Sequence, residues 1–241
     1  MDLKRKDPSA LETPVELLRR LAEVEGLKWI RLLYLYPDGI TPEMIQLIKS
    51  NDKFVKYFDM PLQHISNSVL KSMNRKMTRE EIVMALNLIR TEIPEAVIRT
   101  QFIVGFPGET QQDFEELLQF IAEQKFDRVG CFQYSPEENT PGGKMDQQVD
   151  DKIKQARHDA VMEVQQNISR EKHKDFIGKT VEVVVEGLSD ETDLLLQGRT
   201  SQQAPDIDGV VLINDGQAKI GEFVKVKITD SMEYDLIGEI V

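Results

Sequence analysis

The stretch RTQFIVGFPGET, residues 99–110, decides how the first part of this sequence folds. Its first half is an apolar run typical of a strand, and its second half is a turn that contains Gly105, Pro107, Gly108 and Glu109. A strand that enters a glycine turn before a helix is typical of a βα unit, in which the loops after the strands carry the chemistry. The stretch therefore predicts either a structural βα turn or one wall of a ligand site.

The turn does not match the two common phosphate-binding motifs. It is neither G-x-x-x-x-G-K-[ST] nor G-x-G-x-x-G, and Glu109 would repel a phosphate where such loops place a lysine. A ligand with a positive centre, or an adenine and a ribose, fits this turn better. Gly105 and Gly108 would then let the backbone approach that ligand closely.

Strands and helices alternate along the first part of the sequence. Strand-like apolar runs occupy residues 29–37, 56–64, 97–105 and 128–136, and helical patterns precede, separate and follow them. The last pattern is a long charged helix from about residue 149 to about residue 174. We therefore expect an α/β fold with four parallel strands in this part.

The pattern changes at residue 178. Five short β-like runs, separated by Gly, Asp and Asn, predict a small all-β barrel of the oligonucleotide-binding class over residues 178–241. This segment has thirteen Asp or Glu and five Lys or Arg residues, so its net charge is −8 of the chain's −12. An acidic barrel fits a basic protein better than it fits RNA phosphates.

Composition sets limits on the remaining function classes. No apolar run approaches the roughly 18 residues of a membrane span, and no secretory signal is present, so we expect a cytoplasmic protein without membrane partners. The single cysteine, Cys131, excludes an internal disulfide framework. The three histidines lack metal-ligand spacing and G-x-S-x-G is absent, so we assign no metal ligand and no catalytic residue.

Polar residues near the end of the second predicted strand are further candidates for a site. Gln63 and His64 would lie at the same edge as the glycine turn, and Arg75 follows them as a natural clamp for a carboxylate. His64 also fits the role of a capping or core histidine, and Arg75 also fits an ordinary solvated surface. Pattern alone leaves these alternatives open.

Three segments, in this order and spacing, resemble the radical S-adenosylmethionine (SAM) methylthiotransferases. They are YFDMPLQHISNSVLKSMNR at residues 57–75, VIRTQFIVGFPGETQQDF at residues 97–114 and FQYSPEENTP at residues 132–141. The segment GRTSQQAPDIDGVVLIND, residues 198–215, looks like the TRAM domain of the same family. Within the family, DMPLQHIS and QAPDIDG are closer to the branch that modifies a small-subunit ribosomal protein than to the transfer-RNA branch.

This resemblance implies a fold, a reaction and a ligand pocket. The fold would be a partial TIM-like (βα) barrel of the radical SAM type, truncated at its N-terminus, over residues 1–148, with a connecting helix (149–177) and a small OB-like TRAM barrel (178–241). In the family, a four-iron four-sulfur (4Fe-4S) cluster cleaves SAM reductively, and a methylthio group is added to the β-carbon of an aspartate. By motif position, the residues that would line the SAM pocket are Gln63, His64, Arg75, Gly105, Gly108 and Glu109.

The sequence departs from the family in one important respect. The family holds its radical cluster with C-x-x-x-C-x-x-C, whereas this sequence has only Cys131. We therefore expect the C-terminal part of such an enzyme, inactive alone, which recognises the ribosomal protein through its acidic TRAM domain and has the missing N-terminal half as a further partner.

Two other functions remain open at this point. The chain would fit a non-catalytic adaptor that binds a basic ribosomal partner, or a fragment of a transfer-RNA methylthiotransferase. A barrel that lacks strands also leaves an open parallel edge, so we expect self-association of the isolated chain as a dimer or an aggregate.

Overall fold

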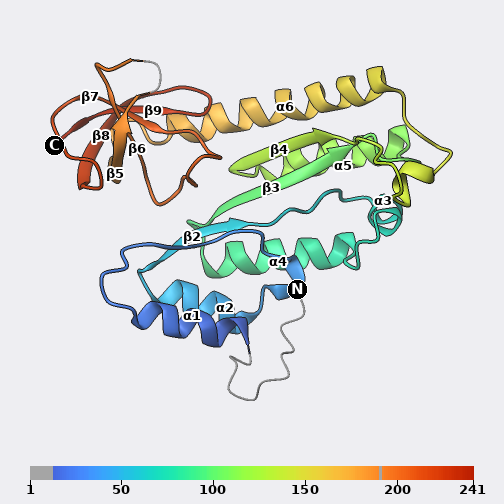
Figure 1. Ribbon diagram of the computed structural model, residues 1–241, viewed down its shortest axis with the longest axis horizontal. Helices are drawn as coiled ribbons and strands as arrows, with labels where there is room; N and C mark the ends of the chain where they lie inside the picture. Colours follow the sequence, from blue (N-terminus) through green and yellow to red (C-terminus); the bar gives the residue numbers. More distant parts are fainter. Residues whose placement is uncertain (1–12, 190–191) are drawn as a thin grey trace.

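The computed structural model describes residues 13–189 and 192–241. Its first part is a four-stranded sheet in the order β1-β2-β3-β4, in which each neighbouring pair is parallel (Figure 1). The strands are β1 (Ile30–Leu32), β2 (Phe54–Asp59), β3 (Val97–Val104) and β4 (Arg128–Gln133). The prediction of four parallel strands is confirmed, whereas the first 12 residues of the predicted first domain lie outside the described residues.

Helices alternate with these strands. They are α1 (Pro14–Glu23), α2 (Pro42–Ser50), α3 (Asn67–Ser72), α4 (Arg79–Glu92), α5 (Gln111–Gln124) and α6 (Asp151–Lys174), with the short 3-10 helices η1 (Pro37–Gly39) and η2 (Gly142–Lys144). A side-chain hydrogen bond caps the start of α1, α2, α4, α5 and α6. At α5, the Thr110 hydroxyl accepts from the Asp113 N–H and the Asp113 carboxylate accepts from the Thr110 N–H, which forms a capping box. The helix therefore starts directly after the glycine turn.

Two strands are shorter than their apolar runs predict. Residues 29–37 form a strand only over Ile30–Leu32, because Tyr34 adopts the left-handed conformation with φ +57. The run 56–64 leaves the regular strand at Asp59, just before Pro61, which has no N–H for the ladder. Both strands end at the same edge of the sheet, so the irregular backbone after them lies where loop residues can form a site.

The main hydrophobic core lies between one face of the sheet and the helices. Side chains alternate along a strand, so Ile98, Phe102 and Val104 of β3 face this core while Arg99 lies on the opposite face. Burial of each such large apolar side chain contributes about 1.5–3 kcal/mol. The helices therefore cover one side of the sheet, and its other face carries Arg99 and a small apolar cluster that includes Val55, Tyr57 and Val97.

The second part is a closed five-stranded barrel with the order β5-β6-β7-β9-β8, as the five β-like runs predict. Its strands are β5 (Thr180–Leu188), β6 (Leu196–Arg199), β7 (Val211–Asp215), β8 (Phe223–Ser231) and β9 (Leu236–Ile240). Its own small core consists of Val183, Val185, Val211, Ile213, Val226, Ile228 and Leu236. Closure satisfies the strand edges, which makes this small domain self-contained.

Helix α6 joins the two parts. Figure 1 shows it running alongside the sheet toward the small barrel. The loop between β6 and β7 crosses to the sheet face opposite the helices, where Ala204 packs with Val55, Tyr57 and Val97. In the described residues, β1 and β4 are the sheet edges, so the βα part is an open, partial barrel.

Candidate functional site

The carboxyl ends of β2 and β3 bring two of the predicted segments together. The Gln63 N–H donates to the Gln101 carbonyl (2.8 Å), and the Gln63 carbonyl accepts from the Ile103 N–H (2.8 Å). Gln63 itself has φ +70. The segment after β2 therefore runs alongside β3 up to the glycine turn, as the carboxyl ends of parallel strands require.

The glycine turn uses both of its glycines in the left-handed region. Gly105 has φ +73 and Gly108 has φ +84, and the turn closes through a hydrogen bond from the Glu109 N–H to the Phe106 carbonyl (2.9 Å). A Cβ at Gly105 would overlap Cγ of Lys154 from α6. Because Gly105 has no side chain, Lys154 of α6 can therefore approach the turn closely.

The Glu109 side chain points into the protein and binds the backbone of the glycine turn. Its Oε2 accepts from the backbone N–H groups of Gly105 and Phe106, the latter at 3.0 Å. Its Oε1 lies 3.4 Å from Arg157 Nη1 and 3.7 Å from His64 Nε2, and the Glu109 side chain is fully buried. Arg157 balances the buried carboxylate, so the geometry gives Glu109 a positioning role rather than a direct contact with a cation in solvent.

His64 is fully buried beside this carboxylate. Its Nδ1 accepts from the Ser66 N–H (3.0 Å), so the neutral ring carries its proton on Nε2, which faces Glu109. The structure therefore shows His64 in the core and capping position that the sequence left open. His64 Nε2 and Glu109 Oε1 have no hydrogen-bond partner, although both atoms are buried.

Asp113 links the two motifs. Its Oδ1 accepts from the hydroxyls of Ser66 and Ser68, and its Oδ2 accepts from Thr110. Burial alone would raise the pKa of Asp113, but the hydrogen bonds from Ser66, Thr110 and Ser68 lower it well below its usual range. The segment after β2 and the start of α5 are thus fixed to each other.

Arg75 lies apart from this group. It lines a cavity of about 680 Å³ together with Tyr34, Tyr36, Pro61 and others, and the guanidinium carbon is 5.9 Å from the centre of the Tyr36 ring. None of the other five predicted pocket residues lines this cavity. The structure therefore brings Gln63, His64, Gly105, Gly108 and Glu109 to one edge and places Arg75 in a separate hollow at that end of the sheet.

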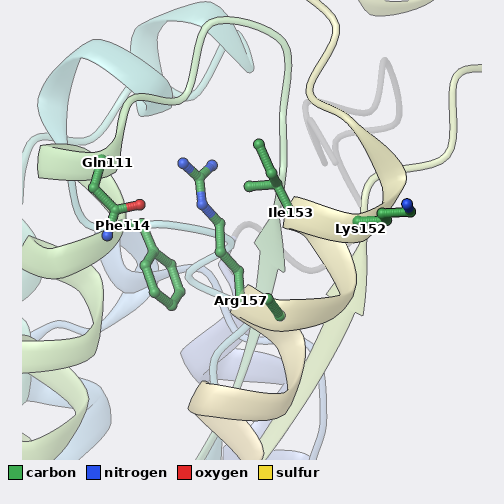
Figure 2. Close-up of a pocket in the computed structure, with 6 residues that line it drawn as sticks. Gln111, Phe114, Lys152, Ile153 and Arg157 are labelled. Carbon is green, nitrogen blue, oxygen red and sulfur yellow. The ribbon is translucent and has the colours of Figure 1, made fainter.

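A second cavity, of about 490 Å³, lies between the start of α5 and α6. It is lined by Gln111, Phe114, Lys152, Ile153, Ala156 and Arg157, and Figure 2 shows the Arg157 guanidinium rising between the two helices. The guanidinium carbon is 5.4 Å from the centre of the Phe114 ring. Arg157 thus connects α5, α6 and the glycine turn.

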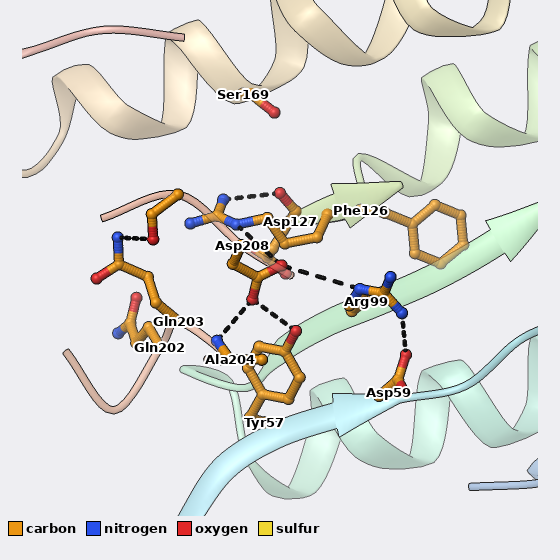
Figure 3. Close-up of polar contacts among 12 residues, drawn as sticks. Tyr57, Asp59, Arg99, Phe126, Asp127, Ser169, Gln202, Gln203, Ala204 and Asp208 are labelled. Atoms are coloured by element: carbon orange, nitrogen blue, oxygen red, sulfur yellow. Dashed lines mark hydrogen bonds and ion pairs between the residues drawn. The ribbon is translucent and has the colours of Figure 1, made fainter. Parts of the chain in front are cut away.

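Sequence reasoning missed the polar junction between the small barrel and the sheet. Asp208 accepts from the Tyr57 hydroxyl (2.6 Å) and from the Ala204 N–H (2.8 Å), and it lies 3.8 Å from Arg99 Nε and 3.9 Å from Arg128 Nε (Figure 3). Its side chain is only 2% exposed. The family motif QAPDIDG contains Asp208, but nothing in the sequence indicated which residues contact this aspartate.

Two further interactions extend this junction. Arg99 Nη1 donates to Asp59 Oδ1 (2.7 Å), and Arg31 Nη2 donates to the carbonyls of Ser201 and Gln203. Burial, followed by the charge of Asp208, raises the pKa of Tyr57 far above its usual value, so its hydroxyl stays a donor. The loop after β6 is therefore docked on the open face of the sheet by charged hydrogen bonds.

The residues present do not fit an iron-sulfur cluster. Cys131 lies in the core, and burial raises the pKa of its thiol to about 12, whereas a cluster ligand is a thiolate. Within residues 13–189 and 192–241, no group of three or more His, Cys, Asp or Glu side chains is placed to hold a metal ion. None of the helices in those residues is both long enough and apolar enough to cross a membrane.

Comparison with known families assigns both parts of the chain. Residues 6–121 match the Radical SAM superfamily, and residues 177–241 match the TRAM domain. One solved structure, coproporphyrinogen III oxidase (HemN) from Escherichia coli, covers 78% of this chain and 50% of its own, with a TM-score of 0.48 and 15% identity. A likeness at that level supports no argument about function.

Curated relatives are much more similar. The ribosomal protein uS12 methylthiotransferase RimO of Bdellovibrio bacteriovorus is 74% identical over 240 residues, which are 100% of this chain and 52% of that protein. The proteins of the same name from Pelobacter propionicus and Clostridioides difficile are 51% and 49% identical, over 98% and 94% of this chain and 52% and 51% of their own length. The chain thus spans about half the length of these relatives. With its Radical SAM region, its TRAM domain and this identity, the chain belongs to the RimO-type methylthiotransferases.

Proposed function

We propose that this chain provides the SAM-binding edge and the substrate-recognition domain of an enzyme that adds a methylthio group to ribosomal protein uS12. The observation that carries the proposal is the 74% identity, over the whole chain, to a uS12 methylthiotransferase. An aspartate β-carbon as the acceptor atom is the finer part of the proposal and follows from the resemblance in the sequence motifs.

The SAM-binding edge is the group after β2 and β3. We assign Gln63, Gly105 and Gly108 to the wall of the pocket, because irregular backbone at the carboxyl ends of parallel strands is where such folds bind ligands. Glu109 and His64 act from beneath, since both side chains are fully buried and Glu109 accepts from two N–H groups of the turn. Both are positioning residues, which hold the glycine turn in place beside the proposed ligand.

The reaction needs chemistry that this chain does not contain. In the radical SAM superfamily, a 4Fe-4S cluster supplies the electron that cleaves SAM, and Cys131 is unsuited to hold one because its thiol is buried and protonated. We propose that the chain alone performs no turnover and that cluster ligands come from the other part of the enzyme.

The TRAM domain is the proposed contact with uS12. Its net charge of −8 complements a basic ribosomal protein. Part of that charge is neutralised at the junction, where Asp208, Glu182 and Glu233 pair with residues of the first part. Asp206, Asp215, Glu222 and Asp230 remain exposed. These exposed carboxylates are available to a basic partner, and a target on the ribosome agrees with the expected cytoplasmic location.

A binding titration tests this function. The folded chain is titrated with purified uS12 and, separately, with bulk transfer RNA, each at low and moderate salt. Binding to uS12 without binding to RNA supports the proposal. Binding to RNA with a steep salt dependence would move the chain to the transfer-RNA branch, and binding to neither would contradict the recognition role.

Anaerobic reconstitution with iron and sulfide tests the inactivity of the chain alone. We expect no retained iron, and stoichiometric iron would contradict this expectation. Self-association through the open sheet edge stays a prediction, which sedimentation velocity tests before either experiment. A non-catalytic adaptor would bind a ribosomal partner as well, so activity after addition of the N-terminal half distinguishes the two functions.

A further inference from the structure

The cavity beside Arg75 is built like a ligand site. Its volume of about 680 Å³ lies within the range of roughly 300–1,000 Å³ typical of small-molecule or side-chain pockets. Its walls come from the residues after β1 and β2 and from the loop between α3 and α4, and include Tyr34, Tyr36, Pro37, Pro61, Leu62 and Arg75. The cavity therefore opens at the edge of the sheet that carries ligands in parallel folds, beside the proposed SAM edge.

Arg75 differs from the other arginines that the structure describes, because its side chain donates no hydrogen bond. Every other arginine in residues 13–189 and 192–241 donates a side-chain hydrogen bond to a carboxylate, an amide or a backbone carbonyl; these residues are Arg19, Arg20, Arg31, Arg79, Arg90, Arg99, Arg128, Arg157, Arg170 and Arg199. Arg75 is half-buried, and the contact of its guanidinium is the face of the Tyr36 ring. A half-buried guanidinium without an acceptor is suited to an incoming anion.

Tyr34, which lines this cavity, has a strained backbone conformation. Tyr34 is an aromatic residue with φ +57, a conformation that is uncommon and unfavourable for residues other than glycine. Asp59 fixes it there, because its Oδ2 accepts from the Tyr34 N–H (3.0 Å) and its carbonyl accepts from the Leu35 N–H (2.8 Å). Tyr34 and Tyr36 are nevertheless 64% and 58% exposed. The cavity therefore has two exposed aromatic rings in its lining, and one of them, Tyr36, lies against the guanidinium of Arg75.

We propose that this cavity binds a carboxylate-bearing side chain of the protein substrate, with Arg75 pairing the carboxylate and the tyrosine and proline walls packing on the neighbouring residues. The proposal rests on the proposed function, which provides a protein as the substrate. A nucleotide would also suit aromatic rings beside a cation. Its phosphate carries more negative charge than a single carboxylate, so the chain's net charge of −12 and Asp38 at the cavity disfavour a nucleotide more strongly than an acidic side chain.

The first test compares affinities for purified uS12 by calorimetry. Arg75→Gln removes the charge and keeps most of the side chain, and we expect its Kd to rise at least about tenfold, as loss of a charge-assisted hydrogen bond predicts. The matched control is Lys71→Gln on the exposed face of α3, which we expect to stay within about twofold of the unchanged chain. Circular dichroism and the melting temperature establish that both variants fold. Equal affinities of Arg75→Gln and the unchanged chain would overturn the proposal.

The second test does not depend on uS12. The probes are acetyl-Leu-Asp-Leu-amide, its Asn counterpart and adenosine monophosphate, added to ¹⁵N-labelled chain, and the readout is the Arg75 Nε–H signal, assigned by its loss in Arg75→Gln. We expect the Asp peptide alone to shift this signal. No shift, an equal shift with the Asn peptide or a shift with the nucleotide alone would overturn the proposal. Failure of the unchanged chain to bind uS12 would instead contradict the proposed function, so the two failures are distinguishable.

Discussion

The junction under the small barrel and the edge after β2 and β3 differ in the number of partners around their buried carboxylates. At the junction, Asp208 has two hydrogen-bond donors and two guanidinium groups around it, and Asp59 pairs with Arg99. At the edge, Glu109 Oε1 and His64 Nε2 are buried without hydrogen-bond partners. Arg31 Nη1 and Arg128 Nε at the junction also lack hydrogen-bond partners, so the difference lies in the carboxylates. Those of the junction have donors and link one domain to the other, whereas a buried carboxylate oxygen without a donor is a place where a ligand can complete the network.

Asp59 connects the junction to a third place, the Arg75 cavity beside the edge. Asp59 pairs with Arg99 at the junction through Oδ1 and holds Tyr34 over the Arg75 cavity through Oδ2. Docking of the TRAM loop and the shape of the cavity therefore depend on the same carboxylate.

Removal of the junction aspartate should produce the largest effect. Asp208→Ala leaves the guanidinium groups of Arg99 and Arg128 buried without their shared carboxylate, so we expect the free energy of unfolding to fall by about 4 kcal/mol. Urea denaturation measures the change. Asp146→Ala, at an exposed position, is the control and should change stability by less than about 0.5 kcal/mol. A loss below about 1 kcal/mol for Asp208→Ala would mean that the junction is not the tightly paired region.

The buried carboxylate at the edge should have a smaller but still large effect. Glu109→Gln leaves Arg157 without a counter-charge while keeping an oxygen acceptor for the turn, and we expect a loss of about 3 kcal/mol. Adding Arg157→Met should restore part of this loss, because the uncompensated charge is then gone. A double-mutant cycle measures the coupling, and strictly additive losses would contradict the pairing.

Substitution of Gly105 tests two separate causes of lost stability, which are backbone strain and side-chain packing. Gly105→Ala places a Cβ at φ +73 and against Cγ of Lys154, so we expect a loss of about 1–3 kcal/mol. In the background Lys154→Ala the overlaps with Cγ and Cδ disappear, and the strain of the left-handed backbone remains with one tight contact of 3.2 Å to Cβ of residue 154. A smaller loss in that background is the expected thermal-denaturation result, and an identical loss would exclude Lys154 as the reason for the glycine.

Substitution of His173 should have the smallest effect on stability, and only at acidic pH. Burial, with a contribution from Arg128, lowers the pKa of His173 below its usual 6.5. The unfolded chain then binds the proton more readily, so stability from the neutral ring is complete above pH 6.5 and declines as pH falls toward the folded pKa. We expect urea midpoints between pH 7 and 5 to fall less steeply in His173→Gln than in the unchanged chain. The same slope in His173→Gln as in the unchanged chain would contradict this role of His173.

The sequence predicts much of the fold because the relevant signals are local. Alternating apolar runs and helix caps specify the four parallel strands, and the five β-like runs specify the small barrel. The limits of these signals are visible at residues 29–37, where the apolar run continues but the left-handed backbone of Tyr34 ends the strand. A change in φ at one residue leaves no trace in hydrophobic periodicity.

The candidate site is predicted only in part. The motifs correctly place Gln63, His64 and the glycine turn at one edge, because consecutive parallel strands end there. They do not show that Arg75 lies in a cavity of its own, or that Glu109 points inward. Those features depend on which side chains of α6 and of the Tyr34 loop pack against each motif.

The sequence by itself determined the order of the elements, the acidity of the TRAM domain and the family. Only the tertiary structure decided which buried charges pair. Asp208 meets Tyr57, 151 positions away in the chain, and Glu109 meets Arg157, 48 positions away. The physical reason is that a buried carboxylate is stabilised by its partners in space, and sequence patterns record a residue's neighbours only over a few turns or strand positions.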